Sequence, residues 1–175
     1  TRKKGTEKRT GYVVDTFKVY KDSSGAEFTA EDMGGLVRIS AAGRSAHAST
    51  PESGINAITA LISLINRLPL ADGKQTDILR GLEKIFPFGE TDGTSVGIKA
   101  EDKTGAATLV FSIFDMQDGE CSGTVDVRFP TCLDLATVEK KEREAFLSAG
   151  CEFDSCMGDE PHCVDESSEF VQSLL

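Results

Sequence analysis

The sequence is poor in the residues that most hydrolytic sites require. Only two histidines, His47 and His162, occur in the 175 residues, and there is no GxSxG sequence, phosphate-binding glycine loop or HExxH motif. A two-metal hydrolytic site of the usual kind needs several histidine and carboxylate ligands that converge on one cleft. We therefore expect no metal site and no complete catalytic set in this chain.

Long hydrophobic runs are also missing, since no apolar run reaches the roughly 18–20 residues that cross a bilayer. No secretory signal opens the sequence. The net charge of the chain is −10. Residues 1–10 nevertheless form a basic cluster, which is typical of a solvated terminus, and a phosphate-binding arm is the alternative. An acidic body disfavours nucleic acid and anionic membranes as partners. The missing secretory signal, together with the cysteine usage described next, leads us to expect a cytoplasmic location.

The five cysteines are odd in number and include no CxxC pair, which indicates reduced thiols: Cys121, Cys132, Cys151, Cys156 and Cys163. The last three could be combined with His162 into a zinc site. That spacing matches no common zinc pattern, and the neighbouring His162 and Cys163 would point to opposite faces of a strand. We therefore expect no zinc there.

Hydrophobic periodicity predicts an α+β domain. Alternation or short apolar runs predict strands over 36–42, 95–99, 107–114, 123–129 and 151–154, while residues 11–22 fit either a strand or a helix. Helical spacing predicts helices over 54–68, 75–85 and 134–149 and a capped helix from about Ser167, with residues 50–53 supplying caps for the first and Gly150 ending the third. The expected architecture is an antiparallel sheet with helices packed on one face.

Two polar residues stand where a scaffold could present them to a ligand. His47 lies in a turn of small residues between a strand and a helix, so its ring could contact a ligand or an oxyanion, or merely pack locally. Arg128 shares a strand face with Asp126, so it could pair with that neighbour or clamp a carboxylate. Five acids are expected to be solvated and without catalytic role: Asp92, Glu101, Asp102, Asp115 and Asp118.

The segment GRSAHASTPESGINA, residues 43–57, closely resembles the lid, or dimerisation, domain of the aminoacylase and desuccinylase family of dinuclear zinc peptidases. The segments at 123–130 (GTVDVRFP), 162–164 and 168–175 resemble its dipeptidase branch, the Xaa-His dipeptidase and carnosinase-like enzymes. The resemblance divides the chain into incomplete first lid strands or linker (1–33), the lid (34–164) and the start of a return helix to a missing catalytic domain (165–175).

The resemblance also implies roles. In that family a separate catalytic domain binds two zinc ions, and none of its motifs occurs here, so the chain is expected to be a dipeptidase lid that is inactive alone. The position of His47 implies stabilisation of the oxyanion during peptide-bond hydrolysis, and that of Arg128 implies binding of the substrate's C-terminal carboxylate. The implied partners are its own catalytic domain and a dipeptide, with a second copy of the chain as a further candidate.

Three alternatives stay open at this point. The chain could be a homodimerising interaction module, the lid of an N-acyl-amino-acid amidohydrolase, or a small-molecule regulatory domain of the α+β type. The histidine segment is shared by aminoacylase, desuccinylase and dipeptidase lids, so only the Arg128 and C-terminal segments favour a dipeptidase.

Overall fold

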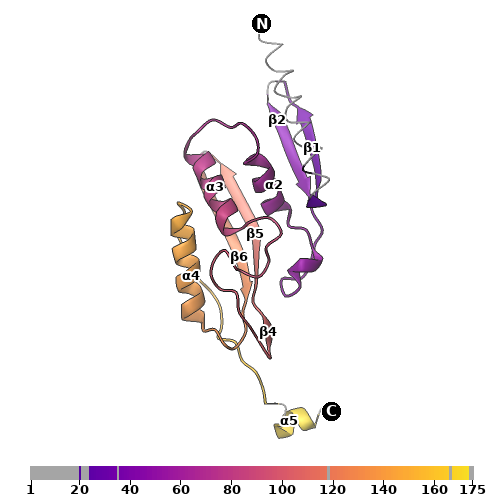
Figure 1. Cartoon of the computed structure of the whole chain (residues 1–175), viewed down its shortest axis with the longest axis vertical. Helices are drawn as coiled ribbons and strands as arrows, with labels where there is room; N and C mark the ends of the chain where they lie inside the picture. The colour runs from indigo at the N-terminus through magenta and orange to yellow at the C-terminus, as the bar shows by residue number, and fades with distance from the viewer. Residues whose placement is uncertain (1–19, 21–23, 35, 118, 166, 174–175) are drawn as a thin grey trace.

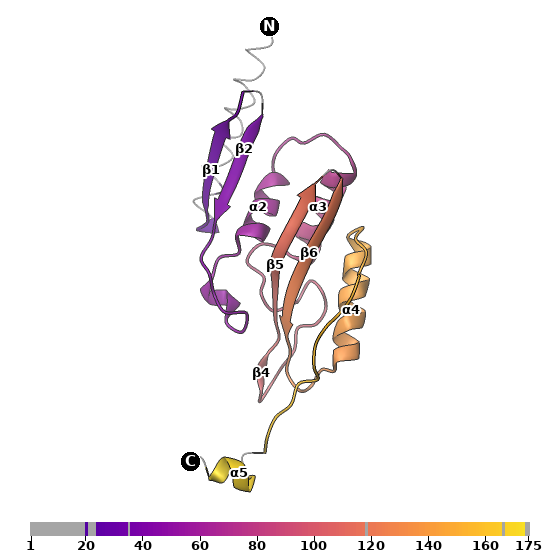
Figure 2. The same ribbon diagram turned by 180° about the vertical axis from the view of Figure 1, so that it is seen from behind.

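The computed structural model describes residues 20, 24–34, 36–117, 119–165 and 167–173. Its fold is α+β, as the sequence predicts. The helices α2 (Ala57–Ile65), α3 (Lys74–Ile85) and α4 (Leu135–Ser148) lie on one side of a hairpin of β5 (Thr108–Gln117) and β6 (Glu120–Arg128). Figure 2 shows the opposite, helix-free face of this hairpin. The strand or helix predicted over 11–22 lies outside the described residues, except for Tyr20.

The described strands form three separate antiparallel hairpins, not the single sheet expected from the sequence. Besides β5–β6 these are β1 (Glu27–Asp32) with β2 (Val37–Ala42), and the short β3 (Glu101–Asp102) with β4 (Gly105–Ala106). The edge of β5 that faces away from β6 is already engaged, because the Leu109 N–H donates to the Thr91 carbonyl at 2.8 Å. The β1–β2 hairpin packs instead on α2, where Ile39 contacts a cluster containing Leu64.

The three long helices confirm the helical periodicity, with one correction at the start of α2. Residues 50–53 do not cap it, since Pro51–Ser53 forms a separate 3-10 turn, η1. The N-cap is Asn56, whose side chain accepts hydrogen bonds from the backbone N–H groups of Ile58 and Thr59. At the other end of the fold Gly150 follows α4 with φ of 81°, as a C-terminal stop requires, and α5 (Glu169–Gln172) begins after the N-cap Ser168.

Two of the predicted strands are wrong. Residues 95–99 form no strand, because 94–97 make a turn in which Gly97 has φ of 83°, and Val96 and Ile98 are both buried in the core. Residues 151–154 pair with no strand among the described residues. Phe153 instead lies under the Arg143 guanidinium, 4.5 Å from its ring centroid, so this segment runs along α4.

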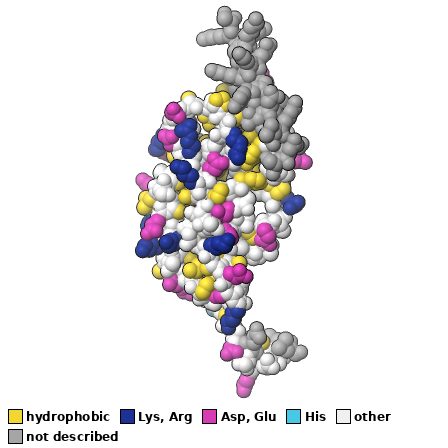
Figure 3. Space-filling view, in the orientation of Figure 1, with side chains coloured by type: hydrophobic (Ala, Val, Ile, Leu, Met, Phe, Trp, Pro, Cys, Tyr) yellow, Lys and Arg dark blue, Asp and Glu magenta, His cyan; other side chains and the backbone are white. Residues whose placement is uncertain are grey.

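The core fills the space between the helices and β5–β6. Its closest ring pair among the described residues is a stack of Phe86 on Phe111 with centroids 4.7 Å apart. Val125, Val127 and Phe129 pack against this core, which confirms the predicted inward face of β6. The helix side carries lysine, arginine and acidic side chains interspersed with one another (Figure 3).

The sequence pattern did not indicate that a glutamate side chain of α4 would be buried. Glu142 lies on the inner stripe of α4 and is only 7% exposed. Burial, with a smaller contribution from Glu139, raises the pKa of Glu142 to about 7.

Candidate functional site

His47 lies on a loop that is closed at its base by backbone pairing. Arg44 and Ile55 form an antiparallel bridge, with N–H to carbonyl distances of 3.0 and 2.8 Å. Two glycines permit this approach, because a Cβ on Gly43 would lie 2.0 Å from the Ile55 carbonyl oxygen and one on Gly54 would lie 2.8 Å from the Arg44 carbonyl oxygen. We name residues 44–55 the histidine loop. Its ends are fixed, and its tip carries His47.

Two side chains anchor the histidine loop to β5. The Thr108 hydroxyl donates to the Ala48 carbonyl at 2.7 Å, directly beside His47. The Asn56 amide donates to the Phe111 carbonyl at 2.8 Å while its oxygen caps α2. Phe111 adjoins the β-bulge at which the β5–β6 register shifts. The loop is therefore held to β5 at its tip and directly after its C-terminal end, which is a preorganised arrangement.

The hydrogen bonds of His47 determine which ring nitrogen faces outward as a donor. Nδ1 accepts the Ser49 backbone N–H at 3.2 Å and lies 2.7 Å from the Ser49 hydroxyl. Because a backbone N–H can only donate, the neutral ring carries its proton on Nε2. The exposed His47 side chain thus offers an Nε2–H donor to a ligand. The local backbone contact expected for a turn histidine is also present, and it is made by Nδ1, the other ring nitrogen.

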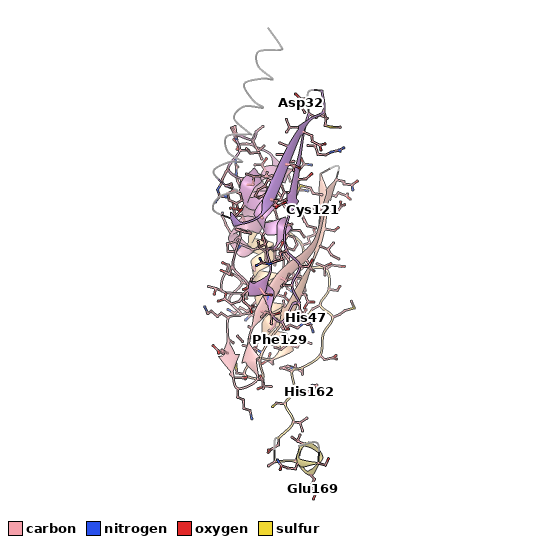
Figure 4. All side chains as sticks on the ribbon, turned by 90° about the vertical axis from the view of Figure 1, so that its right-hand side faces the viewer. Asp32, His47, Cys121, Phe129, His162 and Glu169 are labelled. Atoms are coloured by element: carbon pink, nitrogen blue, oxygen red, sulfur yellow. The ribbon has the colours of Figure 1, made fainter. Side chains whose placement is uncertain are left out.

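Arg128 lies close to the histidine loop through the strand register. In the antiparallel ladder Arg128 is directly opposite Thr108, the residue that holds Ala48. Directly opposite residues in such a ladder have side chains on the same face, about 5 Å apart at Cβ. Figure 4 shows His47 and Phe129, the residue after Arg128, at the same level of the molecule. The fold thus brings the two sequence-predicted site residues to one end of β5–β6.

The Arg128 side chain is paired with its neighbour on the outer face. Nε and Nη2 donate to the two carboxylate oxygens of Asp126 at 2.9 and 3.2 Å. The pair is partly solvated, with side chains 58% and 37% exposed. The neighbouring pairing considered from the sequence is therefore present, and it leaves the Nη1 side of the guanidinium free of Asp126.

Asp102, expected to be a solvated acid at a strand end, lies at the end of β3 and also joins two segments. Its carboxylate accepts hydrogen bonds from the Thr104 backbone N–H at 2.7 Å, the Thr131 hydroxyl at 2.9 Å and the Cys132 backbone N–H at 2.7 Å, in addition to the Thr104 hydroxyl. These donors hold the pKa of Asp102 well below its usual range. Asp102 thereby ties the β3–β4 turn to the segment that leaves β6 just after Arg128.

The other four acids differ from one another. Asp92 is bonded to Thr94 and to the Lys99 ammonium at 2.7 Å, and these contacts lower its pKa to about 2. Glu101 is exposed, Asp115 accepts only from the Gln117 amide among the described residues, and Asp118 lies outside them. None of the described three is hydrogen-bonded or ion-paired to His47 or Arg128, so we assign them no part in the candidate site.

The described residues do not provide a metal centre. No group of three or more His, Cys, Asp or Glu side chains among them could hold an ion. The five cysteines are all free thiols. Nor is any helix in the described part of the chain both long and apolar enough for a membrane span.

Comparison with known families gives a match to the M20 peptidase dimerisation domain over residues 34–150. This chain belongs to that family. The matched region includes the histidine loop, Arg128 and all three long helices, so the candidate site belongs to the M20 domain itself. Comparison with curated proteins gives no match.

The anchors of the histidine loop were not predicted from the sequence. Asn56 directly precedes a run of helical periodicity, which is the position of an N-cap, so its role in α2 could have been found. Its bond to Phe111 and the bond of Thr108 to Ala48 join residues 55 and 60 positions apart. No local pattern signals such contacts.

Proposed function

We propose that this M20 dimerisation domain is the lid of a zinc-dependent dipeptidase and supplies His47 and Arg128 to peptide-bond hydrolysis. The observation that supports this best is the exposed Nε2–H of His47 on a loop anchored to Thr108, directly opposite Arg128 in the ladder. One group can donate a hydrogen bond to a reacting oxygen, and the other can bind a carboxylate.

His47 would act as a hydrogen-bond donor to the oxyanion. Charge develops on the carbonyl oxygen during hydrolysis, and a donor already in place stabilises it without reorganisation. Removal of one such donor commonly lowers the rate by about 10²–10³. The bond from Ser49 to Nδ1 is what makes His47 suited to this role while its ring is neutral.

Arg128 would select substrates that have a free C-terminal carboxylate. A guanidinium binds a carboxylate through two parallel N–H groups, which fixes both its position and its orientation. With Asp126 on the Nε side, the Nη1 side is the one open to such a ligand.

Zinc is part of this proposal only because of the family, since no group of three or more His, Cys, Asp or Glu side chains among the described residues could hold a metal ion. We therefore assign the metal to the catalytic domain of the same enzyme and derive no step through it. On this proposal the chain is inactive alone. It can also pair with a second copy, as the family's name suggests.

A substrate panel tests the proposal in the complete enzyme. A dipeptide, its C-terminal amide and an N-acetyl amino acid are compared in the wild type and in Arg128→Ala. We expect the wild type to favour the dipeptide and Arg128→Ala to lose the preference for dipeptide over amide. Preferred hydrolysis of the N-acetyl amino acid would favour the amidohydrolase alternative, and an unchanged preference in Arg128→Ala would contradict the role of Arg128.

A further inference from the structure

Asp126 accepts two hydrogen bonds from the Arg128 guanidinium. We propose that Asp126 is a positioning residue that fixes the Arg128 guanidinium, so that its Nη1 side receives the substrate carboxylate. This inference rests on the proposed function of Arg128, which it deepens by naming the residue that sets the geometry of carboxylate binding.

The geometry supports a positioning role. Asp126 and Arg128 are two residues apart on β6, so both side chains stand on the same face. The two bonds, Nε to Oδ1 at 2.9 Å and Nη2 to Oδ2 at 3.2 Å, fix the plane of the guanidinium as well as its direction. A single bond would leave rotation about that bond free.

Asp126 is not needed to hold the fold. Both side chains of the pair are substantially exposed, and exposed ion pairs contribute little to stability because water solvates the separated charges well. Among the described residues the Asp126 carboxylate accepts hydrogen bonds from Arg128 alone. Because the Asp126 carboxylate supports neither the core nor another element, its effect is on the position of the Arg128 side chain.

The pairing also decides which N–H groups are left for a ligand. Asp126 occupies the Nε–H and one N–H of Nη2. The groups on Nη1 and the remaining N–H of Nη2 lie side by side at the end of the guanidinium, and a carboxylate can accept from both. The substrate therefore binds end-on while Asp126 stays in place.

The test uses the complete peptidase with four variants: Asp126→Ala, Asp126→Asn, Arg128→Ala and Asp115→Ala. Asp115 is a matched control, because it is an exposed acid on the same hairpin without a contact to Arg128. KM and kcat are measured for a dipeptide with a free carboxylate and for the same dipeptide as its amide. Circular dichroism and metal content verify that each variant is folded and loaded.

We expect Asp126→Ala to raise KM for the free dipeptide by about tenfold, with kcat within about twofold and the amide unaffected. Asp126→Asn keeps an acceptor for the Nε–H, so its KM should lie between those of Asp126→Ala and the wild type. Asp115→Ala should match the wild type.

Three results would overturn the inference. If Arg128→Ala loses the preference for the free carboxylate and Asp126→Ala keeps it, the positioning role is wrong while the proposed function stands. If Asp126→Ala raises KM equally for dipeptide and amide, its effect is only structural. If Arg128→Ala itself keeps the preference, the proposed role of Arg128 and this inference both fail.

Discussion

Replacement of Asn56 by alanine tests whether the histidine loop is held in the way we describe. The Asn56 oxygen accepts from the N–H groups of Ile58 and Thr59, and its amide donates to the Phe111 carbonyl at 2.8 Å. Loss of an N-cap side chain costs about 1 kcal/mol. A partly buried carbonyl left without its donor costs about 1–3 kcal/mol more. We therefore expect the free energy of unfolding to fall by about 2–4 kcal/mol.

The matched control is Asp134→Ala. Asp134 caps α4 by accepting from the Thr137 N–H at 2.6 Å, and within the described residues its side-chain hydrogen bonds all go to Thr137 of the same helix. Its loss should cost only the capping contribution, about 1 kcal/mol. Urea unfolding of both variants, followed by circular dichroism, gives the comparison. If Asn56→Ala costs no more than Asp134→Ala, the bond to Phe111 does not hold the loop and this reasoning is refuted.

Two further predictions concern the base of the histidine loop and the core. Gly43→Ala places a Cβ 2.0 Å from the Ile55 carbonyl oxygen and should lower the free energy of unfolding by about 1–3 kcal/mol. The control is Gly73→Ala, whose Cβ meets no atom within 4 Å and which should change the free energy of unfolding by less than about 1 kcal/mol. Equal effects of the two variants in urea unfolding would contradict the close approach of Gly43 to Ile55. Because burial raises the pKa of Glu142 from 4.5 to about 7, the native state binds this proton more tightly than the unfolded chain, and stability should fall as pH rises between those values. The fall should be at most about 3 kcal/mol. Glu142→Gln should remove this part of the pH dependence, unlike Glu144→Gln at an exposed position, and an unchanged profile would count against the burial of the carboxyl.

The parts of the fold that could be predicted from sequence are those set by local periodicity. The apolar stripes of α2, α3 and α4 and the inward face of β6 are all present. Strand pairing could not be predicted, because it depends on which groups occupy the edge of β5, and one of them is the Thr91 carbonyl. The segment 95–99 shows the same limit, since alternating apolar residues can enter a core from a turn and the residues after it as well as from a strand.

The candidate site shows a similar division. The small residues around His47 indicated an accessible ring, and the neighbouring Asp126 indicated a partner for Arg128. The proximity of His47 to Arg128 depends on the pairing of Thr108 opposite Arg128 and on the hydrogen bond from Thr108 to Ala48. The hydrogen bonds of Asp102 could not be predicted for the same reason, because its donors Thr131 and Cys132 come from a turn about thirty residues away.

The most direct test of the central claim is the kcat of His47→Ala in the complete enzyme with a good dipeptide substrate. We predict that kcat falls by about 10²–10³ while metal content is unchanged. His162→Ala, which removes the other histidine at an exposed position, and Ser49→Ala, which keeps the backbone donor to Nδ1, should both retain nearly full activity. A kcat for His47→Ala close to the wild-type value would contradict the account, because His47 would then be only a turn residue.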